Sequence, residues 1–272
     1  MASNSKGILT QAIENIKSAE AVIKAFKGLP KNAVSIQKNV GQVTDKLLPN
    51  ITGMQTKVIA FSNSLQTLIN KQIDQLDKGN TTTLPQFVKD VKAKIAPINN
   101  LIGQNLTKSH KASDAINQDS IALQKVSINL SAQIAGLASK LAGEKKEVDA
   151  LNKKKLYLIG LGFLGAPGLI ALAILLKKAN DKVDSLKSQE NSIKSQIRTQ
   201  KSFLSQTKSF LKDFSQLINK LSGVLNSMDI LLGDINNIST DIKQGKVSNP
   251  DQARLYLATS LIAVNTLSTD AS

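Results

Sequence analysis

His110 is the residue on which acid–base or nucleophilic catalysis in this chain would depend, because it is the only histidine among 272 residues. A Ser-His-Asp triad needs an imidazole that a partner side chain orients. The neighbours of this histidine, Lys108, Ser109 and Lys111, are instead typical of a solvated helix surface. The chain also has no cysteine, which excludes disulfides and thiolate metal sites. We therefore predict no catalytic constellation.

Ligand-binding motifs are no better supported. Acidic residues are scattered and usually lie beside lysines, so they predict no metal site. No phosphate-binding P-loop occurs. The spacing Gly160-x-Gly162-x-x-Gly165 matches a dinucleotide fingerprint, but it lies in an apolar run without a βαβ context or an acidic ribose ligand. The sequence thus predicts no cofactor, no small-molecule substrate and no enzyme.

The most unusual segment is Leu156–Leu176, LYLIGLGFLGAPGLIALAILL, which contains no charged side chain. About 20 apolar residues are enough to cross the hydrocarbon layer of a bilayer as a helix. Tyr157 lies just inside one border, where an amphipathic ring suits the membrane interface. Lysines that would serve as headgroup anchors close the segment on both sides: Lys153, Lys154, Lys155, Lys177 and Lys178.

Glycine and proline favour a hairpin within this segment. Ala166-Pro167-Gly168-Leu169 fits a type II turn, in which proline fixes φ at the second position and glycine supplies positive φ at the third. Two arms remain, 156–164 and 169–176, each too short to span as a helix, although about 9–11 residues can span as a strand. A single transmembrane helix is the alternative, since membrane helices tolerate Pro and Gly. A β-hairpin, a helix pair and one continuous helix all stay open.

The matched lysine clusters support the hairpin, because in a hairpin both clusters end on the same side of a membrane. The predicted turn contains Gly165, Pro167 and Gly168. The side chains predicted to enter the membrane are the bulky apolar residues of the segment: Leu156, Tyr157, Leu158, Ile159, Leu161, Phe163, Leu164, Leu169, Ile170, Leu172, Ile174, Leu175 and Leu176.

Long amphipathic helices are expected before this segment. The first covers about residues 4–27, and the second covers 32–78 with a heptad seam and a kink near Pro49 and Gly53. A third begins near Pro85 and runs directly into the apolar segment. The polar stretch Ser109–Ser113 allows a break in it.

The cleanest periodicity follows the apolar segment, over residues 177–243, and Gly245 ends that helix. A last helix opens at Pro250 and is apolar over much of its surface, so we expect it to be buried. The predicted fold is all-α, an elongated bundle of long antiparallel helices. Residues 1–155 and 177–272 would form one helical domain, and 156–176 a membrane-directed hairpin inserted between the two longest helices.

The formal net charge of +15 favours anionic partners such as lipid headgroups, nucleic acid or an acidic protein. Nucleic acid is disfavoured, because no groove-reading element with aromatic platforms occurs and aromatic residues make up only 3% of the chain. The first residues, MASNSKGILT, lack the apolar core of a conventional signal peptide.

Long antiparallel helices interrupted by one Gly-rich apolar hairpin, in a basic chain without cysteine, resemble the bacterial α-helical pore-forming toxins. This group includes cytolysin A, the Bacillus haemolytic and non-haemolytic enterotoxin components and the xenorhabdolysin-type binary toxins. Leu156–Leu176, set between helices 116–155 and 177–243, carries the resemblance, which is architectural and covers the whole chain.

The resemblance implies a protein secreted in soluble form, without a conventional signal peptide, whose covered hairpin later inserts into a target-cell membrane. Protomers then assemble into a ring pore as homo- or hetero-oligomers, in many members only with a second or third component. The alternative hypothesis is an integral membrane coiled-coil scaffold that residues 156–176 anchor permanently.

Overall fold

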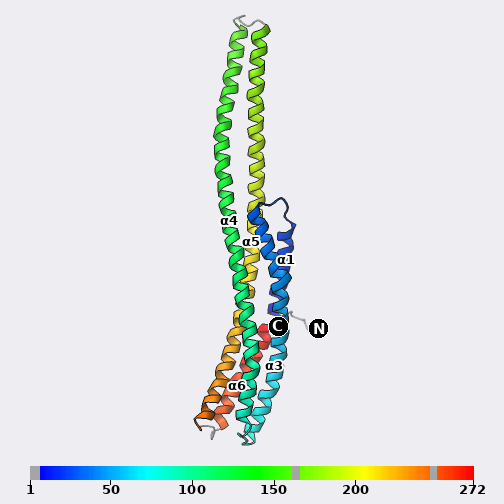
Figure 1. Ribbon diagram of the computed structural model, residues 1–272, viewed down its shortest axis with the longest axis vertical. Helices are drawn as coiled ribbons and strands as arrows, with labels where there is room; N and C mark the ends of the chain where they lie inside the picture. The colour runs from blue at the N-terminus through cyan, green and yellow to red at the C-terminus, as the bar shows by residue number, and fades with distance from the viewer. Residues whose placement is uncertain (1–6, 161–165, 246–249) are drawn as a thin grey trace, which may run out of the picture. The chain divides into compact units, whose positions relative to one another are not determined.

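Helices make up every secondary-structure element of the computed structural model, which describes residues 7–160, 166–245 and 250–272. Two units divide the chain: unit 1 comprises residues 1–27, 34–119 and 206–272, and unit 2 comprises 28–33 and 120–205. Helices α4 (Leu84–Gly160) and α5 (Ala166–Lys243) contribute to both units (Figure 1). The all-α prediction is confirmed.

Unit 1 is a helical bundle in which α3 (Leu48–Asp77) packs along α6 (Pro250–Ala271). Helix α1 (Ile8–Ala25) also contacts α6. The C-terminal Ser272 carbonyl joins these elements, because it accepts hydrogen bonds from the Thr10 hydroxyl at 3.0 Å and the Gln55 amide at 2.9 Å.

The predicted second helix is three consecutive elements: α2 (Lys31–Gln42), the π-helical turn η1 (Val43–Leu47) and α3. Pro49 has no N–H to offer the carbonyl four residues earlier, and its ring crowds that carbonyl. The wider π turn immediately before it accommodates this, with the Leu48 N–H bonded to the Val43 carbonyl. The interruption expected at Pro49 is therefore confirmed, whereas Gly53 lies inside an unbroken α3.

The break allowed at Ser109–Ser113 is absent, because α4 runs continuously through these residues. Ser109 is fully buried, and its hydroxyl donates to the Asn105 carbonyl at 2.8 Å. A serine satisfied in this way by the preceding turn is compatible with a helix interior. Polarity alone was therefore a poor signal of a helix end.

Helix α6 is less buried than its sequence predicts. One stripe is buried, including Leu257, Val264 and Leu267, but Leu255 and Ile262 are exposed. A helix docked on one side of a bundle covers only the stripe that faces its neighbours. The expectation that this helix is buried in the bundle therefore holds for one stripe only.

Helix α5 buries residues outside the periodic apolar stripe that the sequence predicted for 177–243. These additional residues are spaced by seven and are at most 1% exposed: Phe210, Leu217, Val224, Leu231 and Ile238. The rings of Phe210 and Phe214 pack with their centroids 5.9 Å apart. Burial of additional positions in each heptad is expected when a helix packs against several neighbours instead of one.

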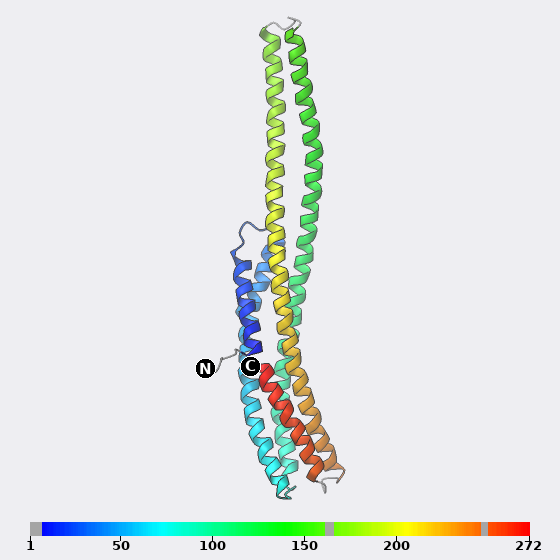
Figure 2. The ribbon, with the colours of Figure 1, turned by 180° about the vertical axis from the view of Figure 1, so that it is seen from behind.

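Unit 2 contains the C-terminal part of α4 and the N-terminal part of α5, which run side by side in both views (Figures 1 and 2). The two helices are joined by an ion pair between Lys182 Nζ and Glu144 Oε1 at 3.1 Å. Apolar positions along their seam are only half-buried over much of its length, as at Leu137, Leu141 and Leu186.

Candidate membrane-interacting segment

The predicted apolar segment lies where α4 ends, at Gly160, and α5 begins, at Ala166. Of its predicted residues, Leu161, Phe163, Leu164 and Gly165 lie outside the described residues. For Tyr157, Leu158, Ile159, Pro167, Gly168, Leu169, Ile170 and Leu172 the structure describes the backbone, which is helical throughout.

The two arms of the segment belong to antiparallel helices. Glu144 and Lys182 are 38 positions apart in sequence. One straight helix would separate them by about 57 Å at about 1.5 Å per residue, yet their charged groups are 3.1 Å apart. The single continuous helix is therefore not the form seen in this structure. Both described arms are helical, so they form a helix pair and not strands.

The type II turn predicted over Ala166–Leu169 is wrong, because these four residues begin α5. Proline is well suited to the first turn of a helix, since the N–H groups there have no partner within the helix and φ is already near the helical value. Pro167 and Gly168 therefore belong to the first turn of a helix and not to a type II turn.

Three large apolar side chains among the described residues at this end of unit 2 are exposed. Leu156, four residues before the end of α4, is 71% exposed, and Ile174 and Leu175 on α5 are 51% and 52% exposed. Leu176 is the exception, at 8%. Leu176, Ala179 and Val183 are buried along the described part of α5.

The lysine clusters lie at different levels along the hairpin. Lys155 is five residues before the end of α4, whereas Lys177 is eleven residues after the start of α5. At about 1.5 Å per residue, these positions are about 8 Å and about 16 Å from the respective helix ends. Lys153, Lys154, Lys177 and Lys178 are exposed and Lys155 is half-buried, and the structure records no ion pair for any of the five.

The apolar end of the hairpin is therefore asymmetric, with a longer apolar stretch on α5 than on α4. Sequence spacing predicted two equivalent arms because it placed the turn at Pro167–Gly168. None of the described helices combines sufficient length with sufficient apolar character to traverse a bilayer.

Glu144 is a residue of this unit that the sequence did not single out. Its pairing with Lys182 shows which turns of α4 and α5 lie level with one another in this unit. The only available signal was an acid in a strongly basic region, which by itself does not specify a partner 38 residues away.

The predictions on metal binding and on His110 concern the described part of the chain. No three His, Asp or Glu side chains gather there to hold a metal ion. His110 is exposed on α4.

Comparison with known proteins gives one clear relationship. No protein-family model and no curated protein matches the chain. Among solved structures, the soluble AhlC of the tripartite alpha-pore forming toxin AHL from Aeromonas hydrophila is 45% identical, with 98% of each chain covered and a TM-score of 0.87. A soluble triple head mutant of AhlC has the same identity and coverage and a TM-score of 0.89.

A more distant likeness concerns the fold alone. The AhlB pore of the same toxin is 16% identical over 96% of both chains, with a TM-score of 0.60. The alignment with AhlC covers 98% of the chain and therefore includes both helices that flank the apolar segment. The chain therefore belongs to the family of bacterial α-pore-forming toxin components that includes AhlC of Aeromonas hydrophila.

Proposed function

We propose that this toxin component enters a target-cell membrane with the apolar end of its α4–α5 hairpin, residues 156–176, and assembles with partner components into a pore. The observation that carries the proposal is the exposure of Leu156, Ile174 and Leu175 on two antiparallel helices beside lysines without ion pairs. The family is not enzymatic, and the AhlC relative comes from a tripartite toxin.

The energetics of insertion are favourable. Fully burying one large apolar side chain stabilises by about 1.5–3 kcal/mol, so three exposed side chains contribute several kcal/mol. Each lysine held near an anionic headgroup layer adds about 1 kcal/mol. The staggered lysines let α5 enter more deeply than α4 while both clusters stay near headgroups, which corresponds to a tilted entry of the hairpin.

The same exposed side chains explain why partners are expected. A contiguous apolar patch in water promotes association. We therefore propose that the chain travels as a soluble, secreted protein whose apolar end is covered until it meets a membrane. In lipid, the helical arms keep their backbone groups bonded, as the hydrocarbon layer requires.

Leu175→Asp tests the membrane role directly. The side chain is half-exposed in solution, so the change leaves helix content intact, but a charge in the hydrocarbon layer costs about 2.5–3.5 kcal/mol. We expect sedimentation with liposomes to weaken about 100-fold. Ile128→Asp, on an exposed residue of α4 in the same unit, is the matched control and should bind as the unmodified chain does.

Equal liposome binding by the Leu175→Asp variant and the unmodified chain would contradict the proposal. Dye release from the same liposomes, with the chain alone and with its partner components, tests pore assembly separately from binding. Recovery of the chain only from detergent-solubilised membranes would favour the permanently anchored scaffold instead.

A further inference from the structure

Helix α6 carries an exposed apolar ridge, formed by Leu255 and Ile262, on its outer face. These side chains are 64% and 66% exposed, and their spacing of seven positions places them two turns apart on one face. Residues 255–269 contain no charged side chain, although charged residues make up 20% of the chain. Apolar residues aligned on an uncharged exposed face favour contact with another protein surface.

A groove with the same spacing lies between α4 and α5 in unit 1 and has a volume of about 510 Å³. Leu225 and Leu232 of α5 form one row of its lining, and Ala96 and Gly103 of α4 form another. In each row the two residues are apolar or small and lie seven positions apart. Beyond its own helical turn, no atom lies within 4 Å of the position that a Cβ of Gly103 would take. Two rows of this kind can receive the ridge of another helix.

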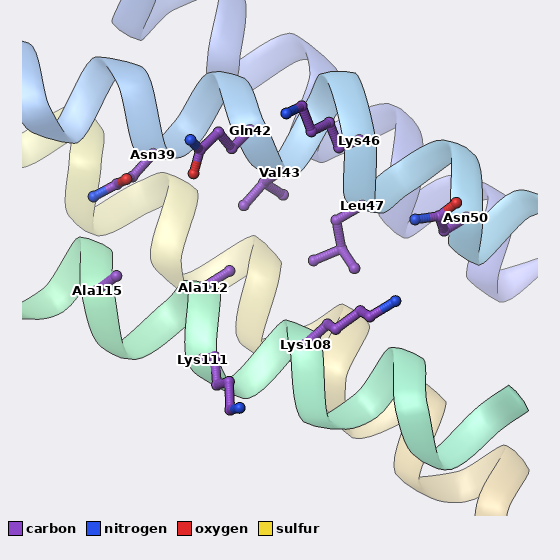
Figure 3. A pocket seen from close by; sticks show the side chains of 10 residues that line it. All are labelled: Asn39, Gln42, Val43, Lys46, Leu47, Asn50, Lys108, Lys111, Ala112 and Ala115. Carbon is purple, nitrogen blue, oxygen red and sulfur yellow. The ribbon is translucent and has the colours of Figure 1, made fainter. Parts of the chain in front are cut away.

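The groove between η1 and α4 does not offer such rows (Figure 3). Its lining residues that lie seven positions apart form pairs in which at least one member is polar or charged: Asn39 and Lys46, Val43 and Asn50, Lys108 and Ala115. An apolar ridge with this spacing would bury a side chain against a polar group there, which costs free energy. The α4–α5 groove is therefore the better match for the ridge.

The α4–α5 groove and α6 lie on different sides of α5. A Cβ atom at Gly223 would lie 3.7 Å from the Asp270 carboxylate of α6, so this side of α5 faces α6. Leu225, which lines the groove, is two residues further along and is rotated by about 200° around the helix axis. The ridge therefore cannot reach the groove of its own chain, whereas it can meet the groove of another copy.

Charged residues near the ridge and the groove are complementary. Asp251, exposed in the first turn of α6, precedes Leu255 by four positions and so lies on the same face. Lys92 lines the groove, precedes Ala96 by four positions and has no ion pair among the described residues. If Leu255 packs beside Ala96 with α6 parallel to α4, the carboxylate of one copy lies level with the ammonium of the other. In the opposite direction it would lie level with uncharged Thr107.

We propose that unit 1 binds a second copy of this chain, with the ridge of α6 in one copy packed into the α4–α5 groove of the other and parallel to its α4. The contact joins two different surfaces, so each copy keeps a ridge or a groove for a further copy. One helix in one groove is a small interface, and both copies carry a net charge of +15, so the association is weak. The contact lies in unit 1 and needs no membrane, so it goes beyond the proposed function.

Single-cysteine variants test this contact, because the chain has no cysteine of its own. The full-length Ile262→Cys and Gly103→Cys variants are mixed in solution and treated with a short bismaleimide. We expect a covalent dimer in the mixture and only background cross-linking with either variant alone. Ile128→Cys, at an exposed position of α4 in unit 2, is the matched control and should give only background when it is mixed with Gly103→Cys.

A second substitution on the ridge tests the apolar contact. Leu255→Asp in the Ile262→Cys chain should slow cross-linking by about tenfold or more, because the leucine no longer contributes apolar burial. Val22→Asp, at an exposed apolar position of α1, makes the same change of charge and should leave the rate unchanged.

Charge reversal tests the direction of docking. Lys92→Glu in the Gly103→Cys chain should slow cross-linking by about fivefold, because it places two carboxylates side by side. Asp251→Lys in the Ile262→Cys chain should then restore the rate, because the two charges are again opposite. Failure of this second change to restore the rate would overturn the parallel docking.

Two further outcomes would overturn the proposal. Equal cross-linking of Ile262→Cys alone and of the mixture would mean that two α6 helices meet face to face. A rate in the mixture no higher than with Ile128→Cys would mean that the ridge and the groove do not meet. The same mixture in a Leu175→Asp background should cross-link equally, and a loss there would assign the association to the apolar end of unit 2. The result is therefore separate from that of the liposome experiment.

Discussion

The two units carry the same kind of apolar heptad pattern but bury it to different extents. In unit 1, Ile51, Val58 and Leu65 of α3 are completely buried. In unit 2, Leu137 and Leu141 of α4 occupy comparable pattern positions and are only half-buried. In a pair of helices, each apolar stripe is covered only by the one partner helix. In a bundle, several helices surround the stripe and exclude water from it. A regular pattern therefore predicts that a residue faces a partner, not how well that partner encloses it.

Truncating a core phenylalanine should produce the largest contrast between the units. Phe214→Ala removes a fully buried ring from unit 1 and should lower the free energy of unfolding by about 3–5 kcal/mol. Leu141→Ala, at a half-buried position of unit 2, should cost about 1 kcal/mol. Hydrogen exchange measured unit by unit would check this, and equal costs would show that unit 2 is enclosed as well as unit 1.

Two buried serines sharpen the description of the unit 1 core. Ser109 donates to the Asn105 carbonyl, so Ser109→Ala should cost about 1 kcal/mol. The Ser62 hydroxyl is buried without a hydrogen-bond partner, so Ser62→Ala should be neutral or stabilise by up to about 1 kcal/mol. Chemical denaturation of both variants gives the comparison, and a large loss for Ser62→Ala would show that its hydroxyl has a partner.

The Lys182–Glu144 ion pair is a weaker contribution, in unit 2. The lysine side chain is 65% exposed, so Lys182→Met should cost at most about 1 kcal/mol, and less as salt is added. Hydrogen exchange of residues 140–150 and 178–186 at low and high salt would measure it. A cost that does not change with salt would mean that the lysine acts through packing and not through its charge.

The smallest effect concerns Lys24 of unit 1. A hydrogen bond with Glu20 raises the pKa of Lys24 above its ordinary value of 10.5, although desolvation opposes the shift. A raised pKa means that the stabilising contact is present below pH 10.5 and is lost as the pH rises through the folded-state pKa. Unfolding followed between pH 9 and pH 11.5 should show a small loss that Lys24→Gln abolishes. A variant that loses as much stability as the unmodified chain over this range would assign the loss to another group.

The presence of the helices could be predicted from the sequence, because apolar spacing is a local signal. Gly28, Pro85 and Gly245, which mark helix ends, are local signals too. The described helices begin or end near these residues, and Gly28 and Gly245 adopt the positive φ that favours glycine. Prediction from neighbouring residues failed where one residue type is compatible with two local structures. Pro167 suits both a turn and a helix start, and buried Ser109 suits both a break and a satisfied helix interior.

The candidate site was predictable as a segment but not as an arrangement. An uncharged run bordered by lysines is visible in the sequence. The sequence does not show that its arms are helical, that Leu156 and Leu175 are exposed, or that the two lysine clusters are offset.

The sequence by itself determined an all-α chain, its strongly basic charge and one apolar segment between two long helices, because helical periodicity and charge are properties of neighbouring residues. Only the tertiary structure decided which faces are enclosed and how α4 and α5 align. These features depend on side chains distant in sequence, and on how many helices surround each seam.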